Sequence, residues 1–464
     1  MSGAVSRQER SARGKAARSV ARRSGNADWS RPPDHPGAVA VLKSQDASRV
    51  AELVPIRYGR MSESPFAMFR GGAAVMAADL AAAPVSGLTA QLCGDAHLSN
   101  FGGFASPDRS LVFDLNDFDE THPGPWEWDL KRLVASIEIA ARQRGLGADQ
   151  ARAAVLATAR EYRRAVRRFA KMTNLEVWYS RLDAEAFRQR WLSRAKGEAK
   201  ARAQRRSARA TSKDSTRALA KLTTRVNGEP RIVGDPPLIV PIEDFAPKAM
   251  LVDADERIRA LLDKYAKTLS GGTRTLLDGY RYAHLARKVV GVGSVGTRAL
   301  IVLLLGGDDS DPLFLQVKEA QRSVLEPYSK RSRYRSHGQR VIEGQWLMQA
   351  SSDIFLGWLS AEGIDGIKRD FYVRQLWDWK LSAEIERMSP AMLAAYGEMC
   401  GWTLARAHAR SADRVALAGY LGSGDVLDRA LVRFAKLYGD QNERDYESLT
   451  KAVKAGEVQA EAGG

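Results

Sequence analysis

The fold is decided by one short stretch, Gly94-Asp95-Ala96-His97-Leu98-Ser99-Asn100. It follows a strand-like run, TAQLC (89–93), and it places an acid directly after a glycine and an amide side chain five residues later. A carboxylate in such a loop can orient and deprotonate a hydroxyl group, and an amide oxygen is a suitable ligand for magnesium. Taken alone, the stretch can also be an ordinary turn, because Asp and Asn side chains form local hydrogen bonds in turns and helix caps.

A second acidic segment follows the short strand-like run SLVFDL (110–115). It places four acids within seven residues, namely Asp114, Asp117, Asp119 and Glu120. Like charges this close repel one another, and a bound cation is a simple remedy. Phosphoryl transfer requires metal ligands and a carboxylate that orients the acceptor, so the two segments together predict a magnesium site. Whether Asp114 or Asp119 shares the metal is left open by the sequence.

A glycine-rich segment, Gly291-Val292-Gly293-Ser294-Val295-Gly296, comes much later in the chain. In a Rossmann fold such glycines would open a helix, but here the apolar run at 299–305 favours a strand. A glycine turn between strands, followed by a lysine that closes a later strand, is typical of kinases, and Lys318 is that lysine. Glu343, on a helix expected at 336–350, is the candidate partner of Lys318. The alternative is a β-hairpin with a solvated terminal lysine.

Composition limits the classes of protein and partner. The 464 residues carry a formal net charge of +16, which nucleic acid, an acidic membrane surface or a phosphorylated ligand could use. Much of this charge lies in the N-terminal run 1–25 and in the segment 196–222, which we interpret as a flexible arm and a solvated helical face. No window approaches the ~18 apolar residues of a membrane span. Two cysteines, Cys93 and Cys400, exclude a disulfide framework, so we expect a soluble cytoplasmic protein.

The patterns divide the chain into parts. We expect a basic flexible arm at 1–45, and then a large, mainly helical part at 46–270 that carries both acidic segments and an Asn-Gly hairpin turn. Residues 271–385 change to β-rich runs broken by Gly and Asp turns, which predict a small antiparallel sheet. Residues 386–445 return to helical patterns, and 446–464 are expected to form a flexible tail.

Two of these segments resemble a known family. GDAHLSN (94–100) resembles the GDLHxxN catalytic loop of aminoglycoside phosphotransferases and related kinase-like small-molecule kinases, and NDFDE (116–120) resembles their metal-binding segment. The resemblance implies that Asp95 is the catalytic base, that Asn100 is a magnesium ligand and that Asp117 is the second metal ligand.

The downstream segment GPWEWDL resembles the same family. The resemblance implies that Asp129, at a helix start, braces the catalytic loop, although the family usually has His where this chain has Cys93. Over residues 45–445 the chain resembles more closely a bacterial family catalogued as a domain of unknown function (number two thousand two hundred and fifty-two). The segments GDAHLSNFG, FDLNDFDET, GPWEWDLKRL, VGVGSVGTR, LQVKEA and LARAHARS carry this likeness, which adds little about activity.

The kinase resemblance implies a two-lobed α+β fold, with a mostly helical large lobe and a small antiparallel β lobe. It implies ATP and Mg²⁺ as cofactors, with the phosphates held by Gly291, Gly293, Ser294, Gly296 and Lys318. In ordinary kinases the β lobe comes first, whereas here the catalytic loop does. We therefore expect a circular permutation, which domains tolerate because their termini lie at the surface. Lys318 must then lie near Asp117, and helices within 391–440 must pack against 50–90 and 129–170.

The function expected is ATP- and magnesium-dependent phosphoryl transfer to a hydroxyl acceptor, a small molecule that the sequence does not identify. Residues 371–376 would form the hinge strand beside the adenine, or a purely structural strand. Adenylyl transfer on the same scaffold is an alternative, and so is a non-catalytic, basic nucleic-acid-binding protein, which no recognised motif supports. Metallophosphoesterases need further Asp, Asn and His motifs that six histidines do not supply. The oligomeric state is left open.

Overall fold

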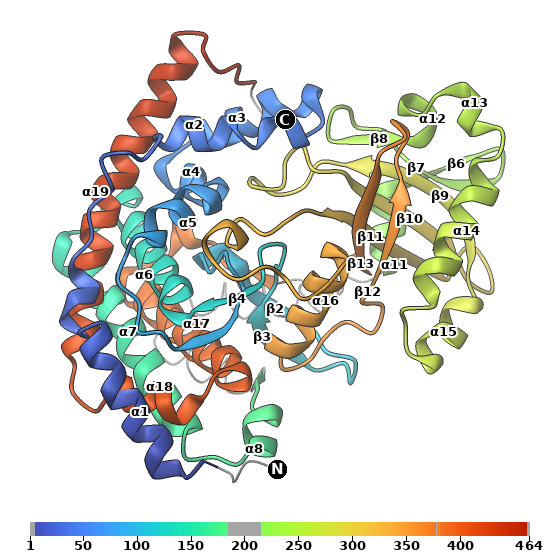
Figure 1. Ribbon diagram of the computed structural model, residues 1–464. Helices are drawn as coiled ribbons and strands as arrows, with labels where there is room; N and C mark the ends of the chain where they lie inside the picture. Colours follow the sequence, from blue (N-terminus) through green and yellow to red (C-terminus); the bar gives the residue numbers. More distant parts are fainter. Residues whose placement is uncertain (1–4, 184–214, 377–378, 380, 462–464) are drawn as a thin grey trace.

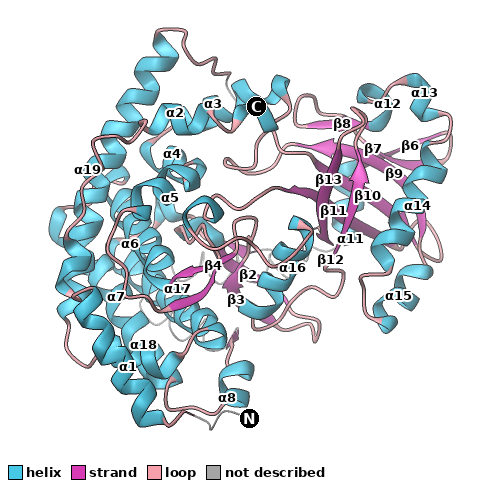
Figure 2. Ribbon diagram, viewed as in Figure 1, coloured by secondary structure: helices cyan, strands magenta, loops and turns pink. Residues whose placement is uncertain are grey.

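The computed structural model describes residues 5–183, 215–376, 379 and 381–461. Its fold is mixed α+β with antiparallel sheets, as the sequence predicts (Figure 1). A helix-rich part occupies one side of the molecule, and a part centred on a six-stranded sheet occupies the other (Figure 2). In the described residues, no helix combines the length and the apolar character needed to cross a membrane.

The six-stranded sheet has the order β12-β13-β11-β10-β9-β8, and its neighbouring strands are antiparallel. The strands are β8 (Ile239–Pro241), β9 (Arg281–Lys288), β10 (Ala299–Leu305), β11 (Pro312–Ala320), β12 (Gly357–Glu362) and β13 (Lys368–Gln375). The three strands predicted around the glycine segment are thus confirmed as β9, β10 and β11. Ala299 of β10 pairs with Lys318 of β11, so the lysine lies at the end of the sheet from which the glycine segment emerges.

The apolar run of β10 belongs to a strand whose two faces are both covered. Val302 and Leu304 face a core formed with α14 (Ala254–Ala266) and α15 (Gly271–Asp278). Ile301 and Leu303 face α11 (Ser215–Leu222) on the opposite side. Successive side chains of a strand point to opposite faces, so a strand buried on both sides has no position for a polar residue.

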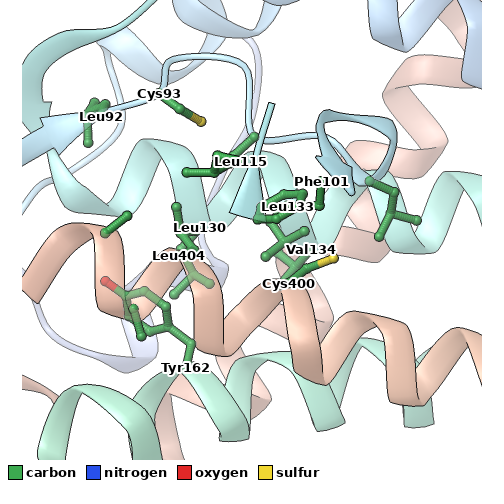
Figure 3. Close-up of a cluster of buried hydrophobic side chains, with 14 of the residues drawn as sticks. Leu92, Cys93, Phe101, Leu115, Leu130, Leu133, Val134, Tyr162, Cys400 and Leu404 are labelled. Carbon is green, nitrogen blue, oxygen red and sulfur yellow. The ribbon is translucent and has the colours of Figure 1, made fainter. Parts of the chain in front are cut away.

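The helix-rich part is built around α6 (Trp126–Gln143), α7 (Ala148–Phe169), α17 (Pro390–Ser411) and α19 (Val426–Lys454). Helix α17 lies close against α7, because Gly401 leaves room for Thr158; a Cβ atom at Gly401 would stand 2.6 Å from the Thr158 carbonyl oxygen. Helix α19 packs along α6 and also contacts α3 (Val54–Ser62) and α4 (Pro65–Gly71). Helices from both ends of the chain therefore share one core, in which Tyr162 and Leu404 are buried (Figure 3).

Short strands carry the loops of the acidic segments. Strand β1 (Thr89–Leu92) pairs with β4 (His122–Pro125). Strands β2 (Phe101–Ala105) and β3 (Leu111–Leu115) lie in a second sheet, which β14 (Leu381–Ser382) and β5 (Leu182–Asp183) complete. The first acidic segment follows β1, and the second follows β3.

The remaining elements connect these parts. A hairpin of β6 (Thr223–Val226) and β7 (Glu229–Ile232) turns at Asn227 and Gly228, which both have positive φ, as the Asn-Gly pair predicts. The other helices described are α1 (Arg7–Val20), α2 (Ala38–Lys43), α5 (Ala73–Ala81), α8 (Asn174–Tyr179), α12 (Ile242–Phe245), α13 (Lys248–Leu251), α16 (His337–Met348) and α18 (Arg414–Leu421).

The ends of the chain differ from the flexible arm and tail expected at 1–45 and 446–464. Helix α1 packs against α18, and the contact is close because Gly14 and Gly419 each leave room for the backbone of the other helix. At the other end, α19 continues to Lys454, and the Glu461 N–H donates to the Pro55 carbonyl oxygen at 3.0 Å. Small residues in the arm, rather than a long apolar run, make this packing possible. Most of the basic segment 196–222 lies outside the described residues; its end forms α11.

Candidate functional site

A cavity of about 720 Å³ lies where the glycine segment and the acidic segments meet. Residues far apart in the sequence line it, including Asp95, Asn100, Asp117, Gly291, Gly293, Ser294 and Lys318. Gly296 and Glu343 are not among the described residues of its wall. The structure therefore gathers most of the sequence-predicted site residues around one cavity.

Asp95 sits in a tight loop directly after β1. Its carboxylate accepts a hydrogen bond from Arg132 Nε of α6 at 2.5 Å, and its second oxygen lies 3.5 Å from His97 Nε2. The side chain is 23% exposed. Gly94, with φ of 81°, makes the turn possible, and a side chain there would collide with Glu120. The loop thus presents the Asp95 carboxylate to the cavity while Arg132 fixes its orientation.

Asp129 holds this loop in place through the backbone N–H groups of the loop. Its two carboxylate oxygens accept hydrogen bonds from the backbone N–H groups of Cys93 and Gly94 at 2.8 and 3.0 Å. His408 Nε2 of α17 lies 3.2 Å from the same carboxylate, which is 1% exposed. Asp129 therefore braces the loop as expected, and because Cys93 contributes its backbone N–H, the cysteine leaves the brace intact.

Asn100 links the two acidic segments. Its amide nitrogen donates to the carbonyl oxygens of Asp95 and Asp117, both at 3.0 Å. Its amide oxygen Oδ1 is buried and has no hydrogen-bond partner among the described residues. A buried carbonyl-type oxygen without a donor is costly unless a ligand satisfies it, and a cation is one such ligand.

Asp117, Asp119 and Lys318 form the centre of the cavity wall. Lys318 Nζ lies 2.7 Å from Asp119 Oδ2 and 3.4 Å from Asp117 Oδ1. The Lys318 side chain is 3% exposed, whereas that of Asp117 is 41% exposed. Tyr372 donates its hydroxyl hydrogen to Asp119, and Ser294 of the glycine segment donates to the same carboxylate at 3.2 Å. The late and early halves of the chain are thus joined at Asp119, which the sequence left as an alternative.

The two aspartates respond differently to this environment. Burial and the neighbouring Asp119 carboxylate raise the pKa of Asp117, despite the attraction of Lys318. Burial also opposes ionisation of Asp119, but Lys318 and the Tyr372 hydroxyl outweigh it, so the pKa of Asp119 falls below its ordinary value. One ammonium therefore compensates one carboxylate well and the second poorly. A divalent cation between Asn100 Oδ1 and Asp117 would supply the missing positive charge.

Asp114 belongs to the scaffold rather than to the cavity. Arg406 of α17 donates to both of its oxygens, and the Ala350 N–H donates to it at 2.9 Å. The side chain is 1% exposed. Of the two aspartates that the sequence offered as additional metal ligands, Asp119 faces the cavity and Asp114 does not.

An N-terminal segment, residues 49–60, holds the glycine segment through its carbonyl groups. Arg49 donates to the carbonyl oxygens of Gly293 and Val295, and Arg60 donates to that of Gly291 at 2.7 Å. The Val50 N–H donates to the Gly296 carbonyl oxygen at 2.8 Å. Gly296, outside the cavity wall, has φ of 88° and packs on the Arg49 side chain. The sequence did not predict these contacts, because an arginine that binds backbone carbonyl groups has no local sequence signature.

Helix α16 contributes a different residue from the one expected. The carboxylate partners of Lys318 among the described residues are Asp117 and Asp119 rather than Glu343. The helix face toward the site carries Arg340, which donates to the Asp119 carbonyl oxygen at 2.8 Å. Glu343 follows Arg340 by three residues, so the two lie one helical turn apart, but among the described residues Glu343 neither lines the cavity nor pairs with Lys318. Arg340 therefore tethers the second acidic segment to the helix.

The strand expected to form the hinge, residues 371–376, is the end of β13. Gln375 and Leu376 line the cavity, and the Gln375 N–H donates to Asp353 at 2.5 Å. Arg374 donates to the Asn116 carbonyl oxygen at 3.0 Å and so ties the strand to the second acidic segment. Contact of this strand with adenine stays a prediction.

Comparison with known proteins follows from this geometry. Among the described residues, no three His, Cys, Asp or Glu side chains gather as a ready metal site, and the Asn100 amide oxygen is a further oxygen that the cavity offers to a cation. The sequence model of the family described as "Uncharacterized protein conserved in bacteria (DUF2252)" matches residues 49–452. No curated protein and no solved structure matches the chain.

Proposed function

The chain belongs to this bacterial family, and from that premise we propose that it is an ATP- and magnesium-dependent phosphotransferase of the kinase-like superfamily. The acceptor is proposed to be a hydroxyl group of a small molecule. One observation carries the proposal. Lys318 lies 3.4 Å from Asp117 in the wall of a cavity that Asp95, Asn100 and the glycine segment also line.

Asp95 is the proposed general base. Its carboxylate is fixed by Arg132 and faces the cavity, where an acceptor hydroxyl group can reach it. In the proposed step, the acceptor oxygen forms a bond to the γ-phosphorus of ATP, and the bond between that phosphorus and the β–γ bridging oxygen breaks. ADP leaves with the electron pair, and the hydroxyl proton passes to Asp95. Such a step needs mainly positioning and charge stabilisation from the protein.

Asn100 and Asp117 are the proposed magnesium ligands, with Asp119 beside them. The fit rests on the unpartnered, buried Asn100 Oδ1 and on the Asp117 and Asp119 carboxylates, which share one ammonium group. Magnesium accepts carboxylate and amide oxygens, and when bound it neutralises charge on the nucleotide phosphates. Lys318 would turn from Asp119 to the phosphates.

The glycine segment is the proposed cover of the phosphates. Its carbonyl oxygens at 291, 293, 295 and 296 are occupied by the N-terminal segment 49–60. A turn fixed through its carbonyl groups keeps a constant shape, which suits backbone N–H groups that bind phosphate.

Circular permutation accounts for the order of the parts. Helices α17 and α19 from the end of the chain pack with α6 and α7, which follow the acidic segments. Lys318 also lies beside Asp117 although the glycine segment comes later in the chain than the acidic segments. Both features support the proposed exchange of lobe order.

Calorimetric titration with ATP and Mg²⁺ tests the proposal on wild type, Asp117→Ala and Lys318→Ala. Asp263→Ala and Lys264→Ala, on the exposed side of α14, are matched controls. A hydrogen bond to a charged group contributes about 1.5–3 kcal/mol, so each site variant should weaken magnesium-dependent binding roughly 10- to 100-fold. Absence of magnesium-dependent ATP binding by wild type, or equal binding by the site variants, would sink the proposal. Label from the γ- or the α-phosphate in the product then separates phosphoryl from adenylyl transfer.

A further inference from the structure

Arg70 is the residue before the last in helix α4, and it lines the same cavity as Asp95. It belongs to the last turn of α4 and lines the cavity together with Asp95 and His97. Its backbone lies against the glycine segment, because a Cβ atom at Gly293 would stand 3.4 Å from the Arg70 carbonyl oxygen. Arg70 therefore occupies the region between the proposed base and the phosphate-covering turn.

Among the described residues, Arg70 has none of the hydrogen-bond or ion-pair partners that the other cavity arginines have. Four arginines are among the described residues of the wall. Arg49 donates to glycine-segment carbonyl groups, Arg374 donates to Asn116 and Gln316, and Arg322 lies 3.5 Å from Glu326. For Arg70 the described structure contains no hydrogen bond or ion pair, and its buried Nε has no acceptor.

Within the described chain, no ion-paired carboxylate balances the positive charge of Arg70. Asp95 is the acid that acts most strongly on Arg70, but Arg132 already binds its carboxylate. The other two acids that act on Arg70 are Glu386 and Glu63, and neither forms an ion pair with it within the described chain. Burial lowers the pKa of Arg70, which shows that the charge is held at a cost. Lys318, in contrast, lies 2.7 and 3.4 Å from two carboxylates.

On the basis of the proposed function, we infer that Arg70 binds an anionic group of the acceptor, a carboxylate or a phosphate. The acceptor class is then a small hydroxylated acid or a phosphorylated alcohol, whose hydroxyl group lies at Asp95 while its anion lies at Arg70. A guanidinium group suits this task, because it binds the oxygens of a carboxylate or phosphate in pairs.

Two sources could supply this anion, the acceptor or the transferred phosphoryl group of ATP. Titration of wild type and Arg70→Gln with MgATP and with MgADP separates them. If Arg70 serves the acceptor, the variant keeps both affinities within about twofold of wild type. Loss of ATP affinity with retained ADP affinity would assign Arg70 to the transferred group and overturn the inference.

The acceptor site is probed directly with inorganic phosphate and acetate. Protein saturated with magnesium and the non-hydrolysable imido analogue of ATP is titrated, so that the nucleotide sites are filled. We expect saturable binding of at least one anion by wild type, at least tenfold weaker binding by Arg70→Gln, and partial recovery in Arg70→Lys. Arg322→Gln, at the same cavity but with an ion-pair partner, should bind as wild type.

Absence of saturable binding by wild type, or equal binding by Arg70→Gln, would overturn the inference. The titration is repeated on nucleotide-free protein, so its result stands even if wild type fails to bind ATP and the proposed function falls. Thermal unfolding of Arg70→Gln is the folding control. Because Arg70 has no hydrogen-bond or ion-pair partner within the described chain, the variant should unfold at or above the wild-type temperature.

Discussion

Replacement of Asp129 by asparagine removes one negative charge and tests whether Asp129 braces the loop that carries Asp95. The Asp129 carboxylate accepts from two backbone N–H groups, at 2.8 and 3.0 Å, and lies 3.2 Å from His408. An asparagine can offer one oxygen to one of these N–H groups. Its NH₂ group must then face the other, so one buried donor loses its acceptor and meets a second donor.

The magnitude follows from these contacts. A hydrogen bond to a charged group contributes about 1.5–3 kcal/mol, and an unsatisfied buried donor costs about 1–3 kcal/mol. The His408 Nε2 contact loses its carboxylate partner as well. Because these contributions overlap, we expect Asp129→Asn to lower the free energy of unfolding by about 3–5 kcal/mol.

The assay is denaturant-induced unfolding of wild type, Asp129→Asn and the exposed control Asp263→Asn. The control should stay within about 0.5 kcal/mol of wild type, as surface changes usually do. Hydrogen exchange at the Cys93 and Gly94 N–H groups gives a local readout, and both should exchange faster in Asp129→Asn. A free energy of unfolding within about 1 kcal/mol of wild type, with unchanged exchange at these two positions, would refute the assignment of Asp129 as the brace.

Three further changes test other contacts. Lys318→Met leaves Asp117 and Asp119 without their ammonium group. In the absence of divalent cations it should lower the free energy of unfolding by about 2–3 kcal/mol, which is less than for a fully buried pair because Asp117 is partly exposed. Thermal unfolding in EDTA and in Mg²⁺ measures this loss, and Mg²⁺ should restore part of the stability. Burial lowers the pKa of His97 to about 4, so the neutral ring contributes its full stabilisation above the ordinary histidine pKa. This contribution is lost as the pH drops toward 4, by about 3 kcal/mol at most. The free energy of unfolding measured between pH 7 and pH 4 should depend less on pH in His97→Gln than in wild type, and an equal dependence would contradict the burial of a neutral ring. A Cβ atom at Gly344 would stand 2.5 Å from Thr121, so Gly344→Ala should cost about 1–3 kcal/mol, whereas Gly271→Ala, with open space around it, should cost nothing measurable by thermal unfolding.

Local patterns predicted the parts of the fold that local interactions determine. The strands around the glycine segment and the hairpin at Asn227 and Gly228 follow from short-range features: a continuous apolar run and a turn that needs positive φ. The brace by Asp129 was expected from the family resemblance. The proximity of Lys318 and Asp117 followed from a resemblance rather than from periodicity, since no local pattern specifies which distant segments meet.

The arginines that organise the cavity could not be predicted in the same way. Arg49 and Arg340 bind backbone carbonyl groups of remote segments, and these acceptors are present at nearly every residue of any chain. Arg132 had one local sign, because it lies one helical turn after Asp129 on α6. The expectation for Glu343 took the right helix, but the side chain of this helix that binds the second acidic segment is Arg340, three positions earlier.

The contact between Glu461 and Pro55 has a practical consequence for work on the protein. A side chain at Gly59 would collide with the Glu461 backbone, so the last described residues lie directly on α3, the helix that carries Arg60 to the glycine segment. Helix α1, in contrast, lies at the far end of the molecule from α3 (Figure 1). An affinity tag or fluorescent fusion joined directly after Glu461 would thus start beside α3, the helix that contacts the turn proposed to cover the phosphates. The same addition ahead of α1 would leave that turn undisturbed.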